Sequence, residues 1–243
     1  MGQQNEARLI EATGIDLRVT DAGWDFARRH EAEIAAHWAR RSAENPHYFD
    51  GSVLLLSGYA LSDDGVFSGR LVRTDFKSFL FWRESGRPEA GVRDTFCTGL
   101  IRSREGHVLL CQQRPGNLND DFFTPPGGFI DARDVDPDGT IDVARAVLRE
   151  IVEETGLREP LVRQGTGFAV FLSRHQVSLA VPWQSDFSGD ALVSEAGRHI
   201  ATEPEGELLR TLALPPGEAL RTLALPEYAR ILLSASYVLK TSP

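Results

Sequence analysis

The sequence is poor in several features that mark specialised classes of protein. Only two of its 243 residues are cysteines, which is too few for a disulfide framework or a zinc site of their own. Both of them, Cys97 and Cys111, lie in apolar runs, so we expect two reduced and buried thiols. No stretch approaches the ~18 uninterrupted apolar residues of a membrane helix, and the first residues lack the basic start and apolar run of a signal peptide. We therefore expect a cytoplasmic protein without a membrane partner.

An excess of basic residues is also lacking. The 35 acidic residues outnumber the 26 lysines and arginines, which gives a net charge of −9 and a pI near 5.2. Sequence-neutral binding to nucleic acid needs a basic surface, so we expect no nucleic-acid partner. A substrate that carries phosphates is compatible with this charge, because a bound divalent cation reverses the local potential.

The composition is otherwise that of an ordinary globular protein. A hydrophobic fraction of 42% and a charged fraction of 25% exclude disorder as the general state. The length exceeds the ~100–150 residues of a common domain without forcing a division. One elaborated domain, and a domain with a smaller N-terminal unit, are therefore both open. Predicted strands and helices alternate along the chain, which favours the mixed α/β or α+β class.

The N-terminal part predicts one amphipathic helix followed by a β-hairpin. Apolar residues, including Ile34 and Trp38, recur at helical spacing within 21–44. Two apolar stretches then flank a polar turn at 62–65, which is the pattern of a hairpin. A Phe-rich segment at 76–85 follows as a short helix or strand.

We interpret the segment 85–91, which collects Gly, Pro and polar residues, as a linker. We accordingly assign an N-terminal extension to 1–91 and the main domain to 92–243. The strands expected in the main domain are 92–103, 107–116, 161–172 and 177–187, and the expected helices are 143–156 and 226–240.

The strongest functional signal is a cluster of acidic residues on the predicted helix 143–156. At about 100° per residue, Glu150, Glu153 and Glu154 fall on one arc. Like charges at this spacing destabilise a helix by a few tenths of a kcal/mol per pair, and no lysine is interspersed. Clustered carboxylates become favourable when a hard divalent cation such as Mg²⁺ binds them. An acidic solvated face is the alternative explanation.

The segment around this helix resembles a Nudix box. The pattern of that family is Gly, five residues, Glu, seven residues, ArgGlu, an aliphatic residue, any residue, GluGlu, any residue, Gly and an aliphatic residue. Gly128, which ends a ProProGlyGly loop, matches the opening glycine, and 149–157 matches the whole second half. The resemblance implies an α/β/α sandwich with a mixed sheet, here with an N-terminal helix and β-hairpin extension. It also implies hydrolysis of a nucleoside diphosphate linked to another moiety.

The resemblance further implies roles for single residues. Arg149 would orient a glutamate by ion pairing, and Gly128 or Gly127 would bring a backbone carbonyl close to the ion or the phosphates. The cofactor would be Mg²⁺ or Mn²⁺, which neutralises phosphate charge and lowers the pKa of an attacking water. Its carboxylate ligands, one of them a candidate base, would be Glu150, Glu153 and Glu154.

The first half of the box departs from the pattern. Asp134 stands where counting from Gly128 requires Glu, and 14 residues instead of seven separate it from Arg149. Counting back from Arg149 places Ile141 there instead, which cannot bind a metal. The missing glutamate favours a Nudix-like binding or regulatory module that has lost turnover, whereas the complete set of helix acids favours a hydrolase. We rank the hydrolase first.

The lengthened loop partly imitates an EF-hand calcium loop. Asp134, Asp136, Asp138 and Gly139 match its first positions, but Arg145 stands where Ca²⁺ requires a bidentate Glu. We therefore expect a solvated Asp-rich turn.

Further site candidates lie outside the box. Arg114, at the end of a strand beside the GlyGly loop, either binds a phosphate with both arms of its guanidinium or is an exposed strand end. A catalytic acid on a later loop, which the family often has, would be one of three residues that are otherwise surface acids. These are Glu203, Glu205 and Glu207.

Two segments of the extension, 45–51 and 74–80, are similar to the UDP-glucose pyrophosphatase branch of the Nudix family. This weaker resemblance implies a small nucleotide substrate, such as a nucleotide-sugar like UDP-glucose, and the family resemblance suggests a homodimer. Aromatic residues of the extension either stack on a base or fill a core. They are Tyr48, Phe49, Phe76 and Trp82.

Overall fold

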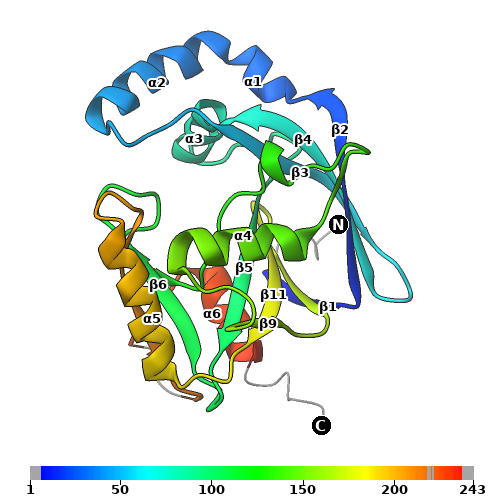
Figure 1. Cartoon of the computed structure of the whole chain (residues 1–243). Coiled ribbons are helices and arrows are strands. Elements are labelled where there is room, and N and C mark those ends of the chain that lie inside the picture. The colour runs from blue at the N-terminus through cyan, green and yellow to red at the C-terminus, as the bar shows by residue number, and fades with distance from the viewer. Residues whose placement is uncertain (1–6, 218–219, 221, 237–243) are drawn as a thin grey trace.

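A mixed β-sheet runs through the part of the chain that the computed structural model describes, namely residues 7–217, 220 and 222–236 (Figure 1). Its strands are β1 (Arg8–Ala12), β2 (Gly14–Gly23), β3 (Ser52–Leu61), β4 (Val66–Asp75), β5 (Arg93–Arg102), β6 (Val108–Gln113), β7 (Phe123–Thr124), β8 (Thr140–Ile141), β9 (Arg163–Gln164), β10 (Phe168–Leu172), β11 (Gln176–Gln184) and β12 (Leu208–Leu214). The helices are α1 (Asp25–Arg29), α2 (Glu31–Glu44), α3 (Phe76–Glu84), the 3₁₀ turn η1 (Ala132–Asp134), α4 (Val143–Thr155), α5 (Gly189–Thr202) and α6 (Glu227–Ser236).

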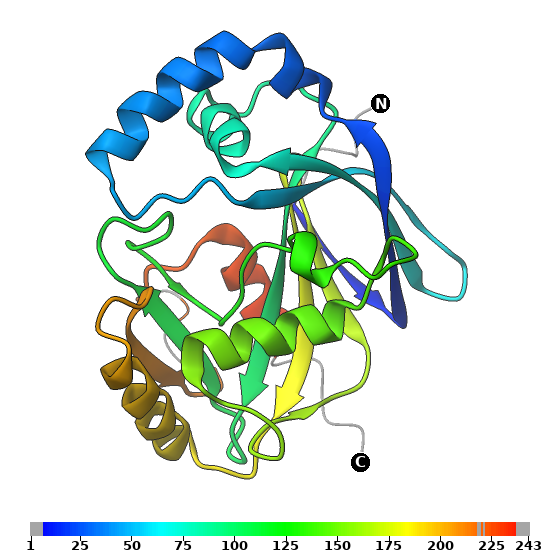
Figure 2. The ribbon, with the colours of Figure 1, turned by 45° about the horizontal axis from the view of Figure 1, so that its top comes forward.

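The strand order along the main path of the sheet is β1-β10-β11-β5-β3-β4-β2-β8, and β6, β7, β9 and β12 branch from it. The pairs β5–β11 and β2–β4 are parallel and the other pairs are antiparallel, so the sheet is mixed. Helix α4 crosses one face and α6 lies on the other (Figures 1 and 2). This arrangement confirms the predicted mixed α/β fold with helices on both faces of the sheet.

Helix α4 confirms the predicted box helix and both of its ends. The side chain of Asp142 accepts a hydrogen bond from the Arg145 backbone N–H at 3.1 Å, which satisfies a free donor of the first turn. Gly156 ends the helix in the left-handed conformation, with φ of 68°. Val147 and Ile151 are fully buried in the main core between this helix and the sheet.

The strands of the N-terminal extension belong to the same sheet as those of the main domain. The predicted hairpin is confirmed as β3 and β4, and β3 also pairs with β5 of the main domain. The Phe-rich segment is a helix, α3, whose N-terminus is capped by the side chain of Asp75. The boundary between 1–91 and 92–243 stays a prediction.

The single helix predicted for 21–44 is wrong in its extent. Residues up to Gly23 belong to β2, which pairs in parallel with β4. The helical part is divided at His30 into α1 and α2. The physical reason is that pairing with β4 holds the chain extended as far as Gly23, and the buried Trp24 anchors the turn into the helix.

Several elements were not predicted, among them β1, β2, β12 and helix α5. The expectation of strands and one helix after residue 157 is therefore wrong, because α5 precedes α6 in this region. The helix predicted for 226–240 is α6, and its predicted residues 237–240 lie outside the described ones. Cys97 and Cys111 are free, buried thiols, as expected. In the described part of the chain, no helix has both the length and the apolar character to cross a membrane.

Candidate active site

The GlyGly loop lies along β5, directly beneath α4. The Gly99 N–H donates to the Pro126 carbonyl at 2.7 Å, and the Cys97 N–H donates to the Gly128 carbonyl at 2.9 Å. A Cβ at position 127, where φ is +156°, would lie 2.2 Å from the Cys97 carbonyl oxygen. A Cβ at position 128 would lie 2.6 Å from a carboxylate oxygen of Glu150. Gly127 is therefore required for this close approach of the loop to β5, and Gly128 leaves room for the carboxylate of Glu150.

Two of the three helix acids, Glu150 and Glu154, are partly buried, so α4 does not present a simple solvated acidic face. Burial raises the pKa of Glu150 to about 7, against the opposing charge of Arg149. Burial, and next the charge of Glu150, raise the pKa of Glu154 well above its usual value. The Gly127 N–H donates to a Glu154 carboxylate oxygen at 2.9 Å and holds it toward the loop. Glu153 is half exposed.

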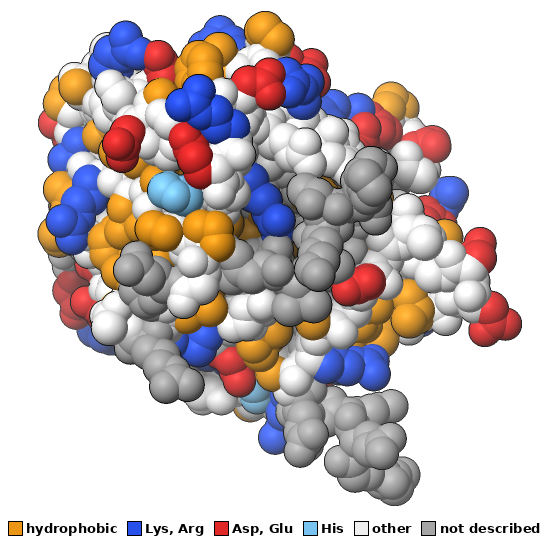
Figure 3. All heavy atoms as spheres, turned by 90° about the horizontal axis from the view of Figure 1, so that it is seen from below, with side chains coloured by type: hydrophobic (Ala, Val, Ile, Leu, Met, Phe, Trp, Pro, Cys, Tyr) orange, Lys and Arg blue, Asp and Glu red, His pale blue; other side chains and the backbone are white. Residues whose placement is uncertain are grey.

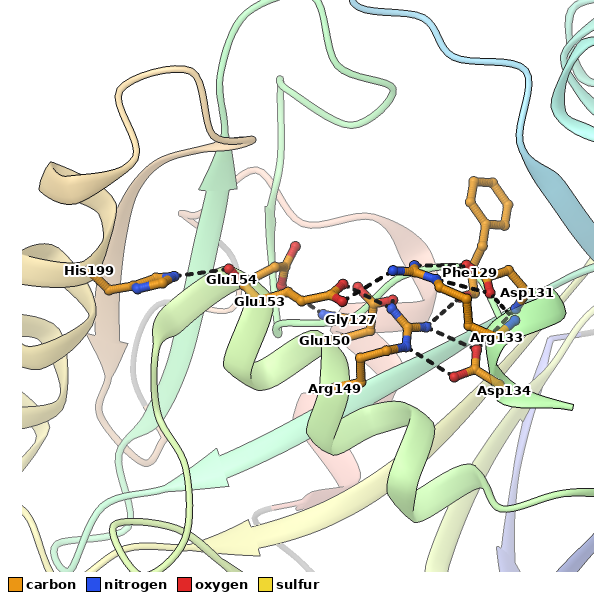
Figure 4. A network of polar contacts seen from close by, with 10 residues as sticks. All are labelled: Gly127, Phe129, Asp131, Arg133, Asp134, Arg149, Glu150, Glu153, Glu154 and His199. Carbon is orange, nitrogen blue, oxygen red and sulfur yellow. Dashed lines mark hydrogen bonds and ion pairs between the residues drawn. The ribbon is translucent and has the colours of Figure 1, made fainter. Parts of the chain in front are cut away.

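Arg149 is the centre of the polar network on α4 (Figure 4). Its Nε and one terminal nitrogen donate to both carboxylate oxygens of Asp134 at 3.0 and 2.9 Å. The other terminal nitrogen lies 2.7 Å from Glu150 and 2.9 Å from Glu153. Burial lowers the pKa of Arg149, but the hydrogen-bonded Asp134 and the charge of Glu150 outweigh it and raise the pKa overall. Arg149 thus orients two glutamates at once.

Asp134 occupies the place of the missing box glutamate. Its side chain is almost fully buried against Arg149, and it also receives a hydrogen bond from the Asp131 N–H at 3.0 Å. Ile141, the residue reached by counting back from Arg149, is instead buried in the main apolar core. Of the two candidates that the sequence left open, Asp134 therefore lies against Arg149 and Ile141 does not.

A second wall, from α5 and the loop before β12, closes the acids of α4 into a cavity of about 210 Å³. Among the later acids, Glu203 and Glu207 line this cavity, whereas Glu205 does not. Burial, with the charge of Glu153, raises the pKa of Glu207. The complete lining is Glu150, Glu153, Glu154, His199, Ile200, Glu203, Gly206, Glu207 and Leu208. On the molecular face shown in Figure 3, by contrast, acidic and basic side chains are interspersed.

His199 lies in this wall and was missed from the sequence. Its Nε2 donates to the backbone carbonyl of Glu153 at 3.0 Å. A Cβ at position 156 would lie 2.8 Å from its ring, so the glycine that ends α4 also makes room for this contact. His199 lies on α5, so a prediction of this helix was needed to find it. The available sequence signal was Ser188, whose side chain caps the helix by accepting a hydrogen bond from the Ala191 N–H.

Besides Arg149, two arginines lie near the acids: Arg114, which the sequence singled out, and Arg133, which it did not. Arg114 lies beside the cavity, where its Nε donates to the Gly206 carbonyl at 2.9 Å and its N–H to the Glu207 carbonyl at 2.7 Å. It therefore anchors the loop of the second wall. Arg133 was missed: one terminal nitrogen lies 3.2 Å from Glu153, while its other nitrogens bind Asp131. Its side chain is 60% exposed.

The extension's aromatic residues mostly serve a second core. Trp82 is fully buried, and Phe76 packs against the same cluster. Tyr48 stacks on Trp38 with ring centroids 6.5 Å apart. Phe49 differs, because 82% of it is exposed. Trp82 and Phe76 therefore pack in this core, whereas the ring of Phe49 is exposed and free to contact a ligand.

The residues of the cavity fit a hard divalent cation by their chemistry. Carboxylates with raised pKa values are acids whose negative charge lacks compensation, and Mg²⁺ prefers oxygen ligands of this kind. Within the described residues, no three candidate ligand side chains already share one metal position. Glu150 and Glu153 instead turn toward Arg149.

The loop, helix and buried acids together define a Nudix-type site, and comparison with known proteins agrees. The family model described as "NUDIX domain" matches residues 75–232. Since this match covers well over half of the chain, the protein belongs to the Nudix family, and we identify it on that ground as a Nudix pyrophosphohydrolase.

The chain is also similar to solved structures that are distant from it in sequence. The MutT protein from Methanosarcina mazei Go1 is 20% identical, with a TM-score of 0.39 over 58% of this chain and 91% of that one. An Ap4A hydrolase from C. elegans is 15% identical, with a TM-score of 0.40 over 59% and 97%. The Nudix hydrolase RenU from M. smegmatis is 12% identical, with a TM-score of 0.39 over 73% and 90%. No curated protein matches the chain.

Proposed function

We propose that the protein hydrolyses the pyrophosphate linkage of a nucleoside diphosphate derivative in a reaction that depends on Mg²⁺ or Mn²⁺. The observation that carries this proposal is the convergence of carboxylates from two walls on one cavity, those of Glu150 and Glu154 partly buried. Isolated buried carboxylates are costly unless they are neutralised or paired. Glu150, Glu154 and Glu207 all have raised pKa values, so the cavity has the charge that a divalent cation compensates.

The proposed ligands are the carboxylates of α4 and one backbone carbonyl. Arg149 holds Glu150 and Glu153, and the Gly127 N–H holds Glu154. The Gly128 carbonyl already accepts a hydrogen bond from β5, which favours Gly127 as the backbone ligand. When bound, the cation supplies charge neutralisation at the phosphates and an acidified water.

We assign proton removal from the attacking water to Glu207. It lies across the cavity from α4, and its pKa is raised by burial and by Glu153, toward the range in which a carboxylate accepts a proton efficiently. The backbone of Glu207 is fixed through Arg114. This contact gives Arg114 an indirect role in place of the predicted phosphate contact.

Arg133 is the cation that we propose for the substrate phosphates. Arg149 is committed to three carboxylates, and the Arg114 Nε is committed to the Gly206 carbonyl. Arg133 contacts Glu153 through one terminal nitrogen and Asp131 through its other nitrogens, and its side chain is largely exposed at the edge of the site. Were Glu153 to bind a metal ion, the terminal nitrogen that now contacts it would be free to donate to a phosphate oxygen.

For the substrate, we propose a nucleotide-sugar such as UDP-glucose. The support is the similarity of 45–51 and 74–80 to the UDP-glucose pyrophosphatase branch, together with the exposed ring of Phe49 in the first of these segments. A cytoplasmic location and a homodimer remain predictions from the sequence.

A substrate panel tests the proposal. UDP-sugars, ADP-ribose, NADH, CoA and diadenosine polyphosphates are incubated with the full chain and Mg²⁺ or Mn²⁺, and the products are identified by mass. We expect cleavage of a pyrophosphate linkage that is abolished by EDTA, with the fastest turnover on a UDP-sugar. Turnover of every substrate at the background rate would contradict the hydrolase and favour a binding module.

A further inference from the structure

The seven residues that lengthen the Nudix box form a small hairpin, which we call the inserted hairpin (135–141). Val135 and Ile141 make an antiparallel bridge across its base. The Asp136 N–H donates to the Thr140 carbonyl at 2.9 Å. At the tip, a carboxylate oxygen of Asp138 accepts hydrogen bonds from the Thr140 N–H and hydroxyl at 3.0 and 2.6 Å. The insertion therefore has a defined conformation and is not a loose loop.

The inserted hairpin continues the sheet of the N-terminal extension. Its strand β8 pairs with β2 in the register Leu17↔Ile141 and Arg18↔Thr140, and the Val19 N–H donates to the Gly139 carbonyl at 2.9 Å. Leu17 and Ile141 are both buried in the main core. In Figure 2 the hairpin reaches from the start of α4 to the edge of β2.

The other end of the hairpin is tied to the candidate active site. Asp134, which binds the Nε and one terminal nitrogen of Arg149, directly precedes it. Arg145 on the first turn of α4 lies 2.7 Å from Asp136 and also donates to the Asp134 carbonyl at 3.4 Å. The hairpin is thus fixed to β2 on one side and to α4 on the other.

The shorter side chain of Asp134 explains why such fixing is needed. An aspartate reaches about 1.5 Å less than a glutamate, which is one carbon–carbon bond. To make the same two-armed contact with Arg149, its backbone must come closer to α4. The seven extra residues change the path of the backbone between the GlyGly loop and α4, and pairing with β2 fixes the conformation of this segment.

We propose that the pairing of the inserted hairpin with β2 positions Asp134, and through Arg149 sets the direction of Glu150 and Glu153. Asp134 is then a positioning residue, and the N-terminal extension acts on the site without touching the substrate. This inference rests on the proposed hydrolase function for its kinetic test, but not for its structural test.

The kinetic test loosens the hairpin at positions remote from the acids. Asp136→Ala removes the ion pair with Arg145, and Val19→Pro removes the hydrogen bond to Gly139. We expect kcat to fall roughly tenfold to a hundredfold with little change in KM, since small displacements of catalytic groups carry costs of this size. The matched control is Asp186→Ala, which breaks another exposed Asp–Arg pair, with Arg163, and should leave kcat unchanged.

A double-mutant cycle separates positioning from general destabilisation. In an Asp134→Asn background, the contact with Arg149 is already impaired, so Asp136→Ala should have little further effect on kcat. Full additivity of the two substitutions, or an unchanged kcat in both Asp136→Ala and Val19→Pro, would overturn the proposal.

A structural readout keeps this test independent of the substrate. The Nε–H of Arg149 donates to Asp134 at 3.0 Å, so its side-chain NMR signal should be protected from hydrogen exchange in the wild type and should lose protection in Asp136→Ala. Retained protection would contradict the proposal even if the enzyme is active. If the wild type cleaves no substrate but the protection behaves as expected, the proposed function fails and the positioning role stands.

Discussion

The cavity has two walls of different construction. On α4, the acids are bound to Arg149, to the GlyGly loop and, through Arg149, to Asp134. In the wall from α5 and the following loop, Glu207 is held by its backbone, and the influences on its pKa are burial and the charge of Glu153. We infer a division of work, in which the acids of α4 would turn from Arg149 to a cation and Glu207 would accept a proton.

The largest effect should come from the α4 wall. Glu154→Gln removes a buried ligand, and we expect turnover to fall by about three orders of magnitude, because several kcal/mol of transition-state stabilisation depend on the metal. The thermal midpoint should not fall, since repulsion with Glu150 is relieved. Steady-state kinetics and calorimetry measure both quantities. Glu31→Gln on the exposed face of α2 is the control. Near wild-type activity in both Glu153→Gln and Glu154→Gln would contradict the assignment of these acids as metal ligands.

Stability of the metal-free protein should depend on pH through Glu150. Its pKa is about 7 in the folded protein against an ordinary value of 4.5, so between these values the folded state binds a proton that the unfolded chain has released. Stability therefore falls as pH rises through this window, by on the order of 3 kcal/mol at about 1.4 kcal/mol per unit.

The corresponding measurement is thermal unfolding with EDTA or Mg²⁺ at pH 5 and pH 8. Mg²⁺ should raise the midpoint more at pH 8, where the acids are ionised. In Glu150→Gln, the difference between the two pH values should shrink. An equal effect of Mg²⁺ at both pH values in the wild type would count against a cation bound by these acids.

The second wall should show a different signature. Glu207→Gln removes the proposed proton acceptor, so we expect kcat to fall about a hundredfold. Because Glu207 is not assigned as a principal ligand, the Mg²⁺ concentration at half-maximal activity should change little. A large loss of Mg²⁺ affinity with an unchanged kcat at saturating Mg²⁺ would show that the two walls do not divide the work as described.

The smallest effect should come from the edge of the site. Arg133→Ala removes an exposed guanidinium, and we expect KM to rise about tenfold with a nearly constant kcat, since one charged hydrogen bond to the substrate is lost. Arg163→Ala, at an exposed ion pair elsewhere, serves as the control. A reduced kcat with constant KM would place Arg133 in the chemistry instead.

The two walls also differ in how far the sequence predicts them. The acids of α4 are near neighbours in sequence on a periodic helix, and the box pattern around them is local. Helix α5 was missed because its only fully buried apolar side chains are Leu192 and Ala196, and Gly197 interrupts it. Glu203, Glu205 and Glu207 look equivalent in sequence, and only the packing of the loop against Arg114 distinguishes them.

The role of Asp134 shows a further limit. The sequence shows an aspartate at the right distance from Gly128 and an insertion after it, but it does not show where the insertion goes. Its pairing with β2 joins residues 17–19 to residues 139–141, and such long-range register depends on the whole sheet. The missing glutamate therefore looked like a sign of lost activity, whereas the structure places a carboxylate on Arg149 by another route.

Titration with Mg²⁺ near pH 6.5 tests the central claim most directly, namely that the acids of α4 bind one cation in this cavity. Binding must displace the protons that Glu150 and its neighbours retain, because a carboxylate binds the metal only when deprotonated. Calorimetry in buffers of different ionisation enthalpy should show saturable binding with net proton release, and Glu154→Gln should lose both. Saturable binding without proton release, or no binding at all by the wild-type protein, would contradict the account.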